Sequence, residues 1–177
     1  ALTQSFTRER PDAFTPYLNT PDALTTYALL FAPQTYARVT AALEQIFQRL
    51  PEFPSRPLRI LDLGCGIGSA ALAAYDLLEG MTGYAPELTG VDWSEDALQA
   101  FKTIHPKVTI LRSDIRAFQP TSTYDIILSS FAFNEALPVL HEAREKLYSL
   151  ASALTEDVPS FILLLEPADR IATPRLL

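Results

Sequence analysis

A glycine-rich stretch at residues 62–68, reading DLGCGIG, constrains the fold of this 177-residue chain more than any other feature. The apolar run LRILDLG, which leads into it, predicts a short buried strand, and SAALAAYDLLEG, which follows it, predicts a helix. Glycine tolerates positive φ and lets a ligand approach the backbone closely, and the first turn of a helix offers free N–H groups. The stretch therefore predicts a strand, a tight bend and a helix, with a place for a ligand at the bend.

Downstream of the bend, the chain alternates between strand-like and helix-like segments. We expect strands at residues 87–92, 107–114, 124–131 and 160–167, and helices at 94–104 and 138–154. Ser94 can cap the first of these helices, and Pro138 can open the second. Four leucines of the second helix are expected to face inward: Leu140, Leu147, Leu150 and Leu154. The alternation predicts a Rossmann-like, doubly wound α/β domain with a mostly parallel sheet covered on both faces.

The segment before the first strand has a helical pattern from Asp22 to Leu50, interrupted by Pro33, which suits the first turn of a second helix. The proline-rich residues 51–57 predict a linker. We therefore expect an N-terminal helical extension and linker over residues 1–57 and a core domain over residues 58–177. The apolar residues of the second helix form one stripe: Tyr36, Val39, Leu43, Ile46, Phe47 and Leu50.

Composition narrows the classes of partner. The net charge of −7 and the lack of a basic stripe argue against direct binding of nucleic acid by this segment, although a partner could present RNA to it. A single cysteine, Cys65, excludes an internal disulfide, and the two histidines, His105 and His141, lack metal-ligand spacing, so we expect no metal site. No apolar run reaches the roughly 18 residues of a membrane span, so we expect a soluble, cytoplasmic protein.

Acidic side chains stand at the ends of successive predicted strands: Asp62, Asp92 and Asp114. Open α/β sheets bind ligands at the carboxyl ends of their strands, where Ser129 also falls. Asp62 would repel the pyrophosphate of a dinucleotide but attract the ammonium group of S-adenosylmethionine (SAM). Asp92 could bind both ribose hydroxyls, and Asp114 could accept from the adenine amino group beside the apolar Ile115. Taken together, the acids favour SAM as the cofactor.

These features also have structural explanations. Asp92 and Asp114 could cap the turns that follow them. Residues 66–71, GIGSAA, fit the pattern of a dinucleotide-binding turn, so an NAD(P)-dependent oxidoreductase stays an alternative. Asp125, which starts its strand away from the expected ligand edge, is interpreted as structural.

Four segments resemble motifs of the class I SAM-dependent methyltransferase superfamily: LDLGCGIGSA, GVDWSEDAL, SDIRAF and YDIILSSFAF. The resemblance covers roughly residues 58–167. It implies that Gly64, Gly66 and Gly68 line the methionine part of SAM, that Asp92 holds the ribose, and that Asp114 with Ile115 holds the adenine. The expected set of cofactor contacts is completed by Asp62, Trp93 and Ser129.

A narrower resemblance links PQTYARVTAALEQI, SSFAFNEAL and LLLEPADRIATPRLL to the mitochondrial-type small-ribosomal-subunit methyltransferase-like family. Members of that family are associated with small-subunit assembly and carry a cysteine cluster, whereas this sequence has only Cys65. A full fold of the superfamily continues with a helix and an antiparallel hairpin after the fifth strand. We therefore expect the sequence to be a fragment that lacks the C-terminal strands.

The resemblance implies a methyltransferase whose acceptor is unknown, with rRNA or a ribosome-associated molecule as a candidate. Methyl transfer needs mainly a well-positioned acceptor, and the sequence identifies no catalytic residue. Asn134 and Glu135 are the best placed to contact the acceptor. Tyr36 could close over the cofactor, although its place in the apolar stripe favours packing. A non-catalytic SAM-binding assembly factor stays an alternative.

Overall fold

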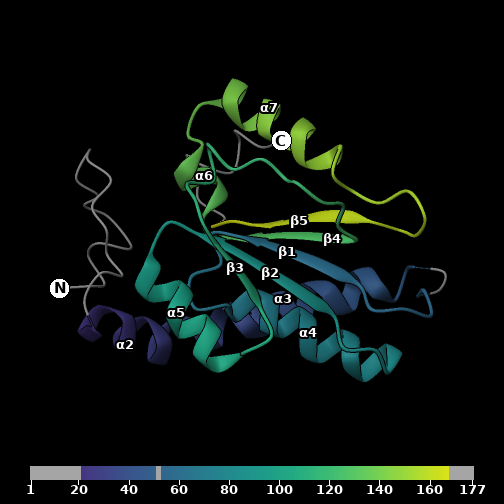
Figure 1. Cartoon of the computed structure of the whole chain (residues 1–177), viewed down its shortest axis with the longest axis horizontal. Helices are drawn as coiled ribbons and strands as arrows, with labels where there is room; N and C mark the ends of the chain where they lie inside the picture. Colours follow the sequence, from purple (N-terminus) through teal and green to yellow (C-terminus); the bar gives the residue numbers. More distant parts are fainter. Residues whose placement is uncertain (1–20, 51–52, 168–177) are drawn as a thin grey trace.

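The computed structural model describes residues 21–50 and 53–167 and contains one parallel sheet (Figure 1). The order across the sheet is β3-β2-β1-β4-β5, with β1 at the centre, and each neighbouring pair is parallel. This arrangement confirms the parallel α/β fold predicted from the alternation of elements. The strands are β1 (Arg59–Leu63), β2 (Glu87–Asp92), β3 (Thr109–Arg112), β4 (Ile126–Ser130) and β5 (Phe161–Leu165).

Helices cover both faces of the sheet (Figure 1). One face carries α2 (Pro21–Leu30), α3 (Ala32–Phe47), α4 (Ser69–Thr82) and α5 (Glu95–Ile104). The other face carries the short α6 (Phe133–Ala136) and α7 (Leu140–Ala151). None of the helices within the described ranges is long and apolar enough to cross a membrane.

Local sequence signals account for the helix starts. Pro33 lies in the first turn of α3, where a missing N–H costs no helical hydrogen bond. Ser94 caps α5, since its hydroxyl oxygen accepts from the backbone N–H of Ala97 at 3.3 Å. The predicted stripe on α3 also forms: Val39, Leu43 and Phe47 are buried, while Tyr36, Ile46 and Leu50 pack partly buried against the same core.

The prediction of a helix over residues 138–154 was wrong in its limits and in which of its leucines face the core. Val139 is extended (φ −93°, ψ 120°) and forms the N-cap, so the helix starts at Leu140 rather than at Pro138. Leu140 is consequently 50% exposed, whereas Leu147 and Leu150 pack inward as expected. Leu154 lies beyond the helix end but still contacts the core.

The alternation of side chains along β1 divides the core into two layers. Ile60 packs into the layer beneath α3 and α4, whereas Leu61 and Leu63 pack into the layer beneath α6 and α7. Because neighbouring residues of a strand point to opposite faces, Asp62 lies on the α4 face with Ile60. The fold therefore buries one carboxylate of the glycine-rich stretch beneath the helix that follows it.

Phe101 of α5 fills a space that two glycines leave open. A Cβ on Gly68 or on Gly90 would overlap its ring, and on Gly90 the distances would be 2.8 Å to the ring and 2.9 Å to Cys65 Sγ. Phe101 itself is fully buried. This packing explains part of the glycine pattern without reference to any ligand.

We expect Gly90→Ala to lower the free energy of unfolding by about 1–3 kcal/mol, because the new methyl group overpacks the core against Phe101. Gly80→Ala is the matched control: a Cβ there meets nothing within 4 Å, and alanine favours the helix. Urea denaturation measures both. The same two substitutions are then made in a Phe101→Leu background. There Gly90→Ala should lower the free energy of unfolding by less, and an unchanged loss would contradict the packing assignment.

Candidate functional site

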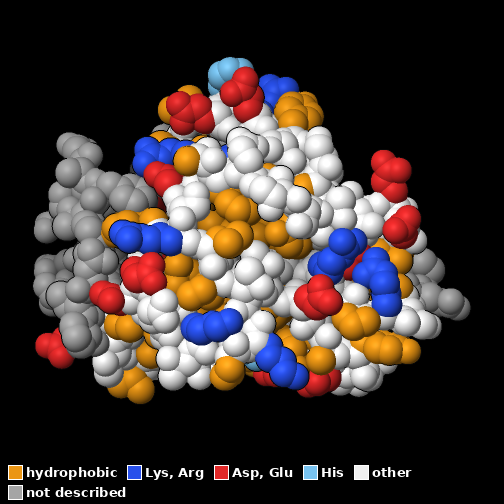
Figure 2. All heavy atoms as spheres, viewed as in Figure 1, with side chains coloured by type: hydrophobic (Ala, Val, Ile, Leu, Met, Phe, Trp, Pro, Cys, Tyr) orange, Lys and Arg blue, Asp and Glu red, His pale blue; other side chains and the backbone are white. Residues whose placement is uncertain are grey.

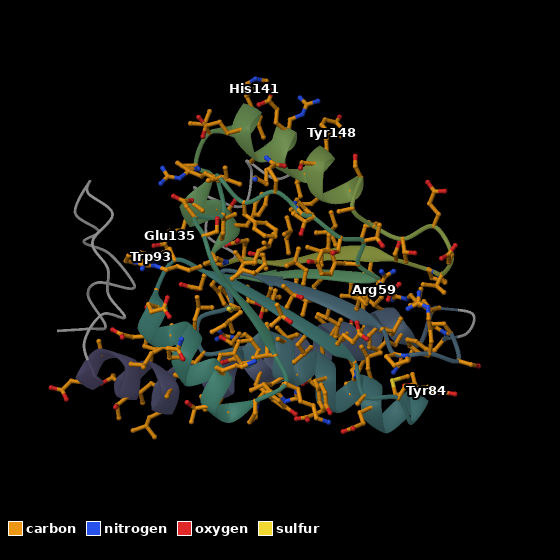
Figure 3. All side chains as sticks on the ribbon, in the orientation of Figure 1. Arg59, Tyr84, Trp93, Glu135, His141 and Tyr148 are labelled. Carbon is orange, nitrogen blue, oxygen red and sulfur yellow. The ribbon has the colours of Figure 1, made fainter. Side chains whose placement is uncertain are left out.

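The carboxyl ends of the strands bring the predicted acids to one edge of the sheet. Asp62 lies in β1 opposite Gly90 of β2, Asp92 ends β2, and Asp114 follows β3. Figure 3 shows Trp93 and Glu135 at this same edge, while Arg59 and Tyr84 lie at the opposite end of the sheet. The predicted clustering of acids along one edge is therefore present in the fold.

The bend after β1 is a run of left-handed glycines, and at one of them a Cβ would fit without a clash. A Cβ on Gly64 would collide with Ala132, and one on Gly68 would collide with Phe101. At Gly66 (φ +53°) the nearest atom to a Cβ would be the hydroxyl oxygen of Tyr27, at 3.8 Å. Gly64 and Gly68 are thus required by the protein's own packing, whereas at Gly66 the constraints are its positive φ and the neighbouring Tyr27.

Asp92 holds this bend in place. Its Oδ2 accepts from the N–H of Gly66 at 2.8 Å, and its Oδ1 accepts from the N–H of Ser94 at 2.8 Å. Burial raises the pKa of Asp92, although these backbone donors oppose the shift. The backbone N–H of Trp93 also interacts with this carboxylate. A carboxylate has about four acceptor positions, so three backbone donors leave capacity for one more hydrogen bond from a ligand. The structural and the ligand-binding interpretations of Asp92 are therefore compatible.

Asp62 is a fully buried acid with only half of its carboxylate satisfied. Oδ2 accepts from the N–H of Ala71 in the first turns of α4 at 3.0 Å. Oδ1 has no hydrogen-bond partner within the part of the chain that the structure describes. Burial raises the pKa of Asp62 to about 7, and the nearby charge of Asp92 adds to the shift. A buried, unpaired acceptor of this kind is costly, and a positively charged donor would relieve the cost.

The end of β3 supplies the acid with the greatest exposure. Asp114 forms an ion pair with the side chain of Arg116 and also accepts from its N–H at 2.9 Å, and this hydrogen bonding lowers the pKa of Asp114. Its carbonyl closes the following turn, which fits the capping interpretation. Ile115 is buried, and its Cδ1 lies 3.1 Å from where a Cβ of Gly64 would be. Ile115 therefore adjoins the bend, and its expected contact with the adenine stays a prediction.

Ser129 near the end of β4 and Asn134 just after the strand each have a buried polar side-chain atom. The buried hydroxyl of Ser129 donates to the Leu63 carbonyl at 2.9 Å and so joins β4 to β1. The N–H of Asn134 donates to Glu166 Oε1 at 3.1 Å, and its side-chain Nδ2 is buried without an acceptor among the described residues. Glu135 follows it in α6. Ser129 thus has a clear structural role, whereas Asn134 keeps an unused donor.

Tyr36 does not close over the bend. Its hydroxyl donates to Asp76 Oδ2 on α4 at 2.7 Å, so it joins α3 to α4, in line with its place in the apolar stripe. Tyr27 of α2 occupies the position beside Gly66 instead. Burial raises the pKa of Tyr27 to about 12, with further contributions from the charges of Asp62 and Asp92. The sequence offers no motif that marks Tyr27, because its position depends on how α2 packs.

Asp125, as expected, and Cys65 both have structural roles. Although burial opposes ionisation, hydrogen bonds from Arg56, at 2.8 Å, and from the Arg59 N–H, at 2.7 Å, keep the pKa of Asp125 below its usual value. Asp125 thus has a structural role at the start of β4. Cys65 is buried against Gly90, and burial raises the pKa of its thiol well above the usual value, which fits packing rather than nucleophilic chemistry.

The described residues contain no group arranged to hold a metal ion, and the face in Figure 2 carries no basic stripe. No group of three His, Cys, Asp or Glu residues is arranged to hold a metal ion within residues 21–50 and 53–167. Figure 2 shows Lys and Arg side chains scattered among Asp and Glu on the face in view, rather than gathered into a stripe. The chemistry at the edge of the sheet is therefore that of carboxylates and backbone N–H groups.

Comparisons of sequence point to one family. The family model described as a methyltransferase domain matches residues 60–154, more than half of the chain. A release factor glutamine methyltransferase from Rhodopirellula baltica is 33% identical over 105 residues, which cover 55% of this chain. The matched region is only 33% of that relative, so the chain spans about a third of its length.

Comparisons of structure find the same fold in several methyltransferases. The plantazolicin methyltransferase BpumL in complex with SAH has a TM-score of 0.63 at 24% identity, covering 93% of this chain and 56% of that chain. DesVI of Streptomyces venezuelae has a TM-score of 0.61 at 19% identity, covering 84% and 58% respectively. The citrinin polyketide synthase CMeT domain has a TM-score of 0.62 at 23% identity, covering 90% and 43%.

We expect Asp62 to make the protein less stable as the pH rises from about 4 to about 7. The unfolded carboxyl ionises near its ordinary pKa of 3.8, whereas the folded one keeps its proton up to about 7. Between these values the folded state binds the extra proton, so its contribution to stability is largest in acid and is lost through pH 7. In the neutral variant Asp62→Asn, the free energy of unfolding should decrease less steeply with pH, with a slope smaller by up to about 1.4 kcal/mol per pH unit.

Urea denaturation at several pH values from 4.5 to 8 measures this difference. Asp96→Asn, an exposed acid in the first turn of α5, is the control and should leave the slope unchanged. Equal slopes for the unmodified protein and Asp62→Asn would show that Asp62 titrates as an ordinary acid.

Proposed function

The chain belongs to the methyltransferase-domain family, and from this membership we propose that it transfers a methyl group from SAM bound at the carboxyl edge of its sheet. The residues that hold the cofactor, the acceptor and the activity of the whole protein are parts of this proposal. One observation carries the assignment of the site: the buried, unpartnered Oδ1 of Asp62.

Asp62 fits the amino-acid end of SAM. The ammonium group there is a positive donor, and a buried carboxylate with one free oxygen is the acceptor that it needs, directly or through a water molecule. A pyrophosphate at the same bend would face two acids, Asp62 and Asp92, whose charges would repel it. The site therefore favours SAM over a dinucleotide, and the oxidoreductase alternative loses its support.

The strand order suggests how the rest of the cofactor would lie. Asp92 at the end of β2 would receive the ribose with the acceptor capacity that the backbone donors of Gly66, Trp93 and Ser94 leave. Asp114 and Ile115, beyond β3, would hold the adenine ring. Trp93 follows Asp92 at the same edge and is half-buried, so its indole can cover the nucleoside.

SAM supplies an electrophilic methyl group on its sulfonium, so the protein's main task is to position the acceptor in line with that group. Asn134 and Glu135, just after β4, are the residues proposed for the acceptor side. The unused Nδ2 of Asn134 can donate to an oxygen of the acceptor. Glu135 can take a proton from the acceptor's attacking atom.

For the acceptor, the charge of −7 and the mixed surface favour a molecule presented by a protein over bare RNA. A ribosome-associated acceptor, suggested by the narrower sequence resemblance, satisfies this condition. The curated relative is named for a glutamine of release factor, so a protein side chain is an equally consistent class. A module that binds SAM without transferring its methyl group is the second candidate function.

We expect Asp92→Asn to weaken binding of S-adenosylhomocysteine (SAH) by about tenfold or more, equal to at least about 1.4 kcal/mol. The amide keeps one acceptor oxygen but replaces the other with a donor, so it cannot hold both the bend and the ribose. Isothermal titration calorimetry measures the affinity. Asp96→Asn makes the same chemical change on a nearby exposed residue and should bind SAH normally. Normal binding by Asp92→Asn would contradict the ribose assignment.

Methyl transfer is tested with SAM labelled in its methyl group, added with the full-length protein to cell extract. We expect label in macromolecules that is lost on protease treatment and survives ribonuclease treatment, and Asp92→Asn should transfer less. Label that is lost with ribonuclease alone would contradict the preference for a protein acceptor. SAM binding without any transfer would favour the non-catalytic module.

A further inference from the structure

Phe131 has an unusual backbone conformation just beyond β4. Its φ of 58° is the one positive value at a non-glycine residue in the described part of the chain. Bulky residues rarely adopt this region, and such conformations cluster at ligand sites. The surrounding structure maintains it: the Phe131 N–H donates to the Leu165 carbonyl at 2.7 Å, and the next residue, Ala132, fills the space beside Gly64. Phe131 is therefore fixed at the margin of the glycine bend.

Arg38 of α3 lies over the ring of Phe131. Its guanidinium carbon is 5.4 Å from the ring centroid, within the range of a cation–π interaction. Nη2 donates to Gln34 Oε1 at 3.2 Å, and Arg38 forms no ion pair with any residue in the described ranges. A guanidinium stacked in this way keeps donors in its own plane for an oxyanion.

The strand order places this pair at one end of the proposed cofactor site. The proposed site has the adenine at the end of β3 and the ribose at the end of β2. Because β1 and then β4 come next in the sheet, the methionine part would extend past β1 toward β4. Phe131 follows β4, so Arg38 lies where the methionine part would end.

Charge also separates the two ends of the methionine part. Asp62 and Asp92 would repel a carboxylate and attract an ammonium group. Arg112 ends β3 and donates to the Trp93 carbonyl, and Arg116, which follows the strand, pairs with Asp114. A carboxylate near β4 would therefore find its positive partner in Arg38.

We propose that Arg38, positioned by the ring of Phe131, binds the carboxylate of the cofactor's methionine part. This inference rests on the proposed function, because it needs SAM at the edge of the sheet. It divides the zwitterion between two sides of the bend, with the ammonium group at Asp62 and the carboxylate at Arg38. An oxyanion on the methyl acceptor is the competing occupant of Arg38.

Decarboxylated SAM, which keeps the sulfonium and the amino group but lacks the carboxylate, separates the possibilities. Calorimetry with the full chain should show SAM binding about tenfold more tightly than decarboxylated SAM. Arg38→Gln should weaken SAM binding by about the same factor and change binding of decarboxylated SAM less than twofold. Phe131→Leu should reduce the preference for SAM less severely. Arg49→Gln, which removes an exposed arginine just after α3, should leave the preference intact.

An equal loss for both ligands in Arg38→Gln would show that the arginine supports only the fold and would overturn the inference alone. Unchanged SAM binding in this variant would overturn it too, and reduced methyl transfer alongside would favour the acceptor as the occupant. A wild-type chain that binds neither ligand would overturn the proposed function together with the inference.

Discussion

A buried carboxylate is stable only when donors reach both of its oxygens, and in Asp62 only one oxygen has a donor among the described residues. The alternation of β1 places it beneath α4, where the Ala71 N–H satisfies Oδ2 and leaves Oδ1 without a partner among the described residues. Hydrophobic residues could fill this position at lower cost, and this cost is the reason for proposing that the acid binds the cofactor. Burial raises the pKa of Asp62 to about 7, and a cationic ligand would stabilise its ionised form.

The other contacts at this edge arrange the backbone around that acid. Asp92 ties Gly66 to the start of α5, so the bend after β1 and the end of β2 form one unit. Ser129 ties β4 to β1 at the same level. Tyr27 lies beside Gly66, so α2 contacts the bend as well. The residues proposed to bind the cofactor are thus also those that hold the edge together.

Local patterns were enough to predict the strands, the parallel sheet, the Ser94 cap and the structural role of Asp125, because each depends on residues close in sequence or on strand direction. The limits of α7 were not predictable, since the extended Val139 displaces the helix start and turns Leu140 outward. Gly68 belongs to the glycine motif, but its contact with Phe101 is visible only in three dimensions. Tyr27 and Arg38 reach the site through the packing of α2 and α3, and no motif marks them.

The central claim, that Asp62 receives the ammonium group of SAM, predicts a proton exchange on binding. At pH 6 Asp62 is largely protonated, whereas α-amino groups keep their proton below about pH 7.7. Titration of SAH at pH 6 in two buffers of different ionisation enthalpy counts the protons exchanged. We expect the release of close to one proton per SAH bound, and a much smaller release from Asp62→Asn. Binding without proton release, or the same release in both proteins, would contradict it.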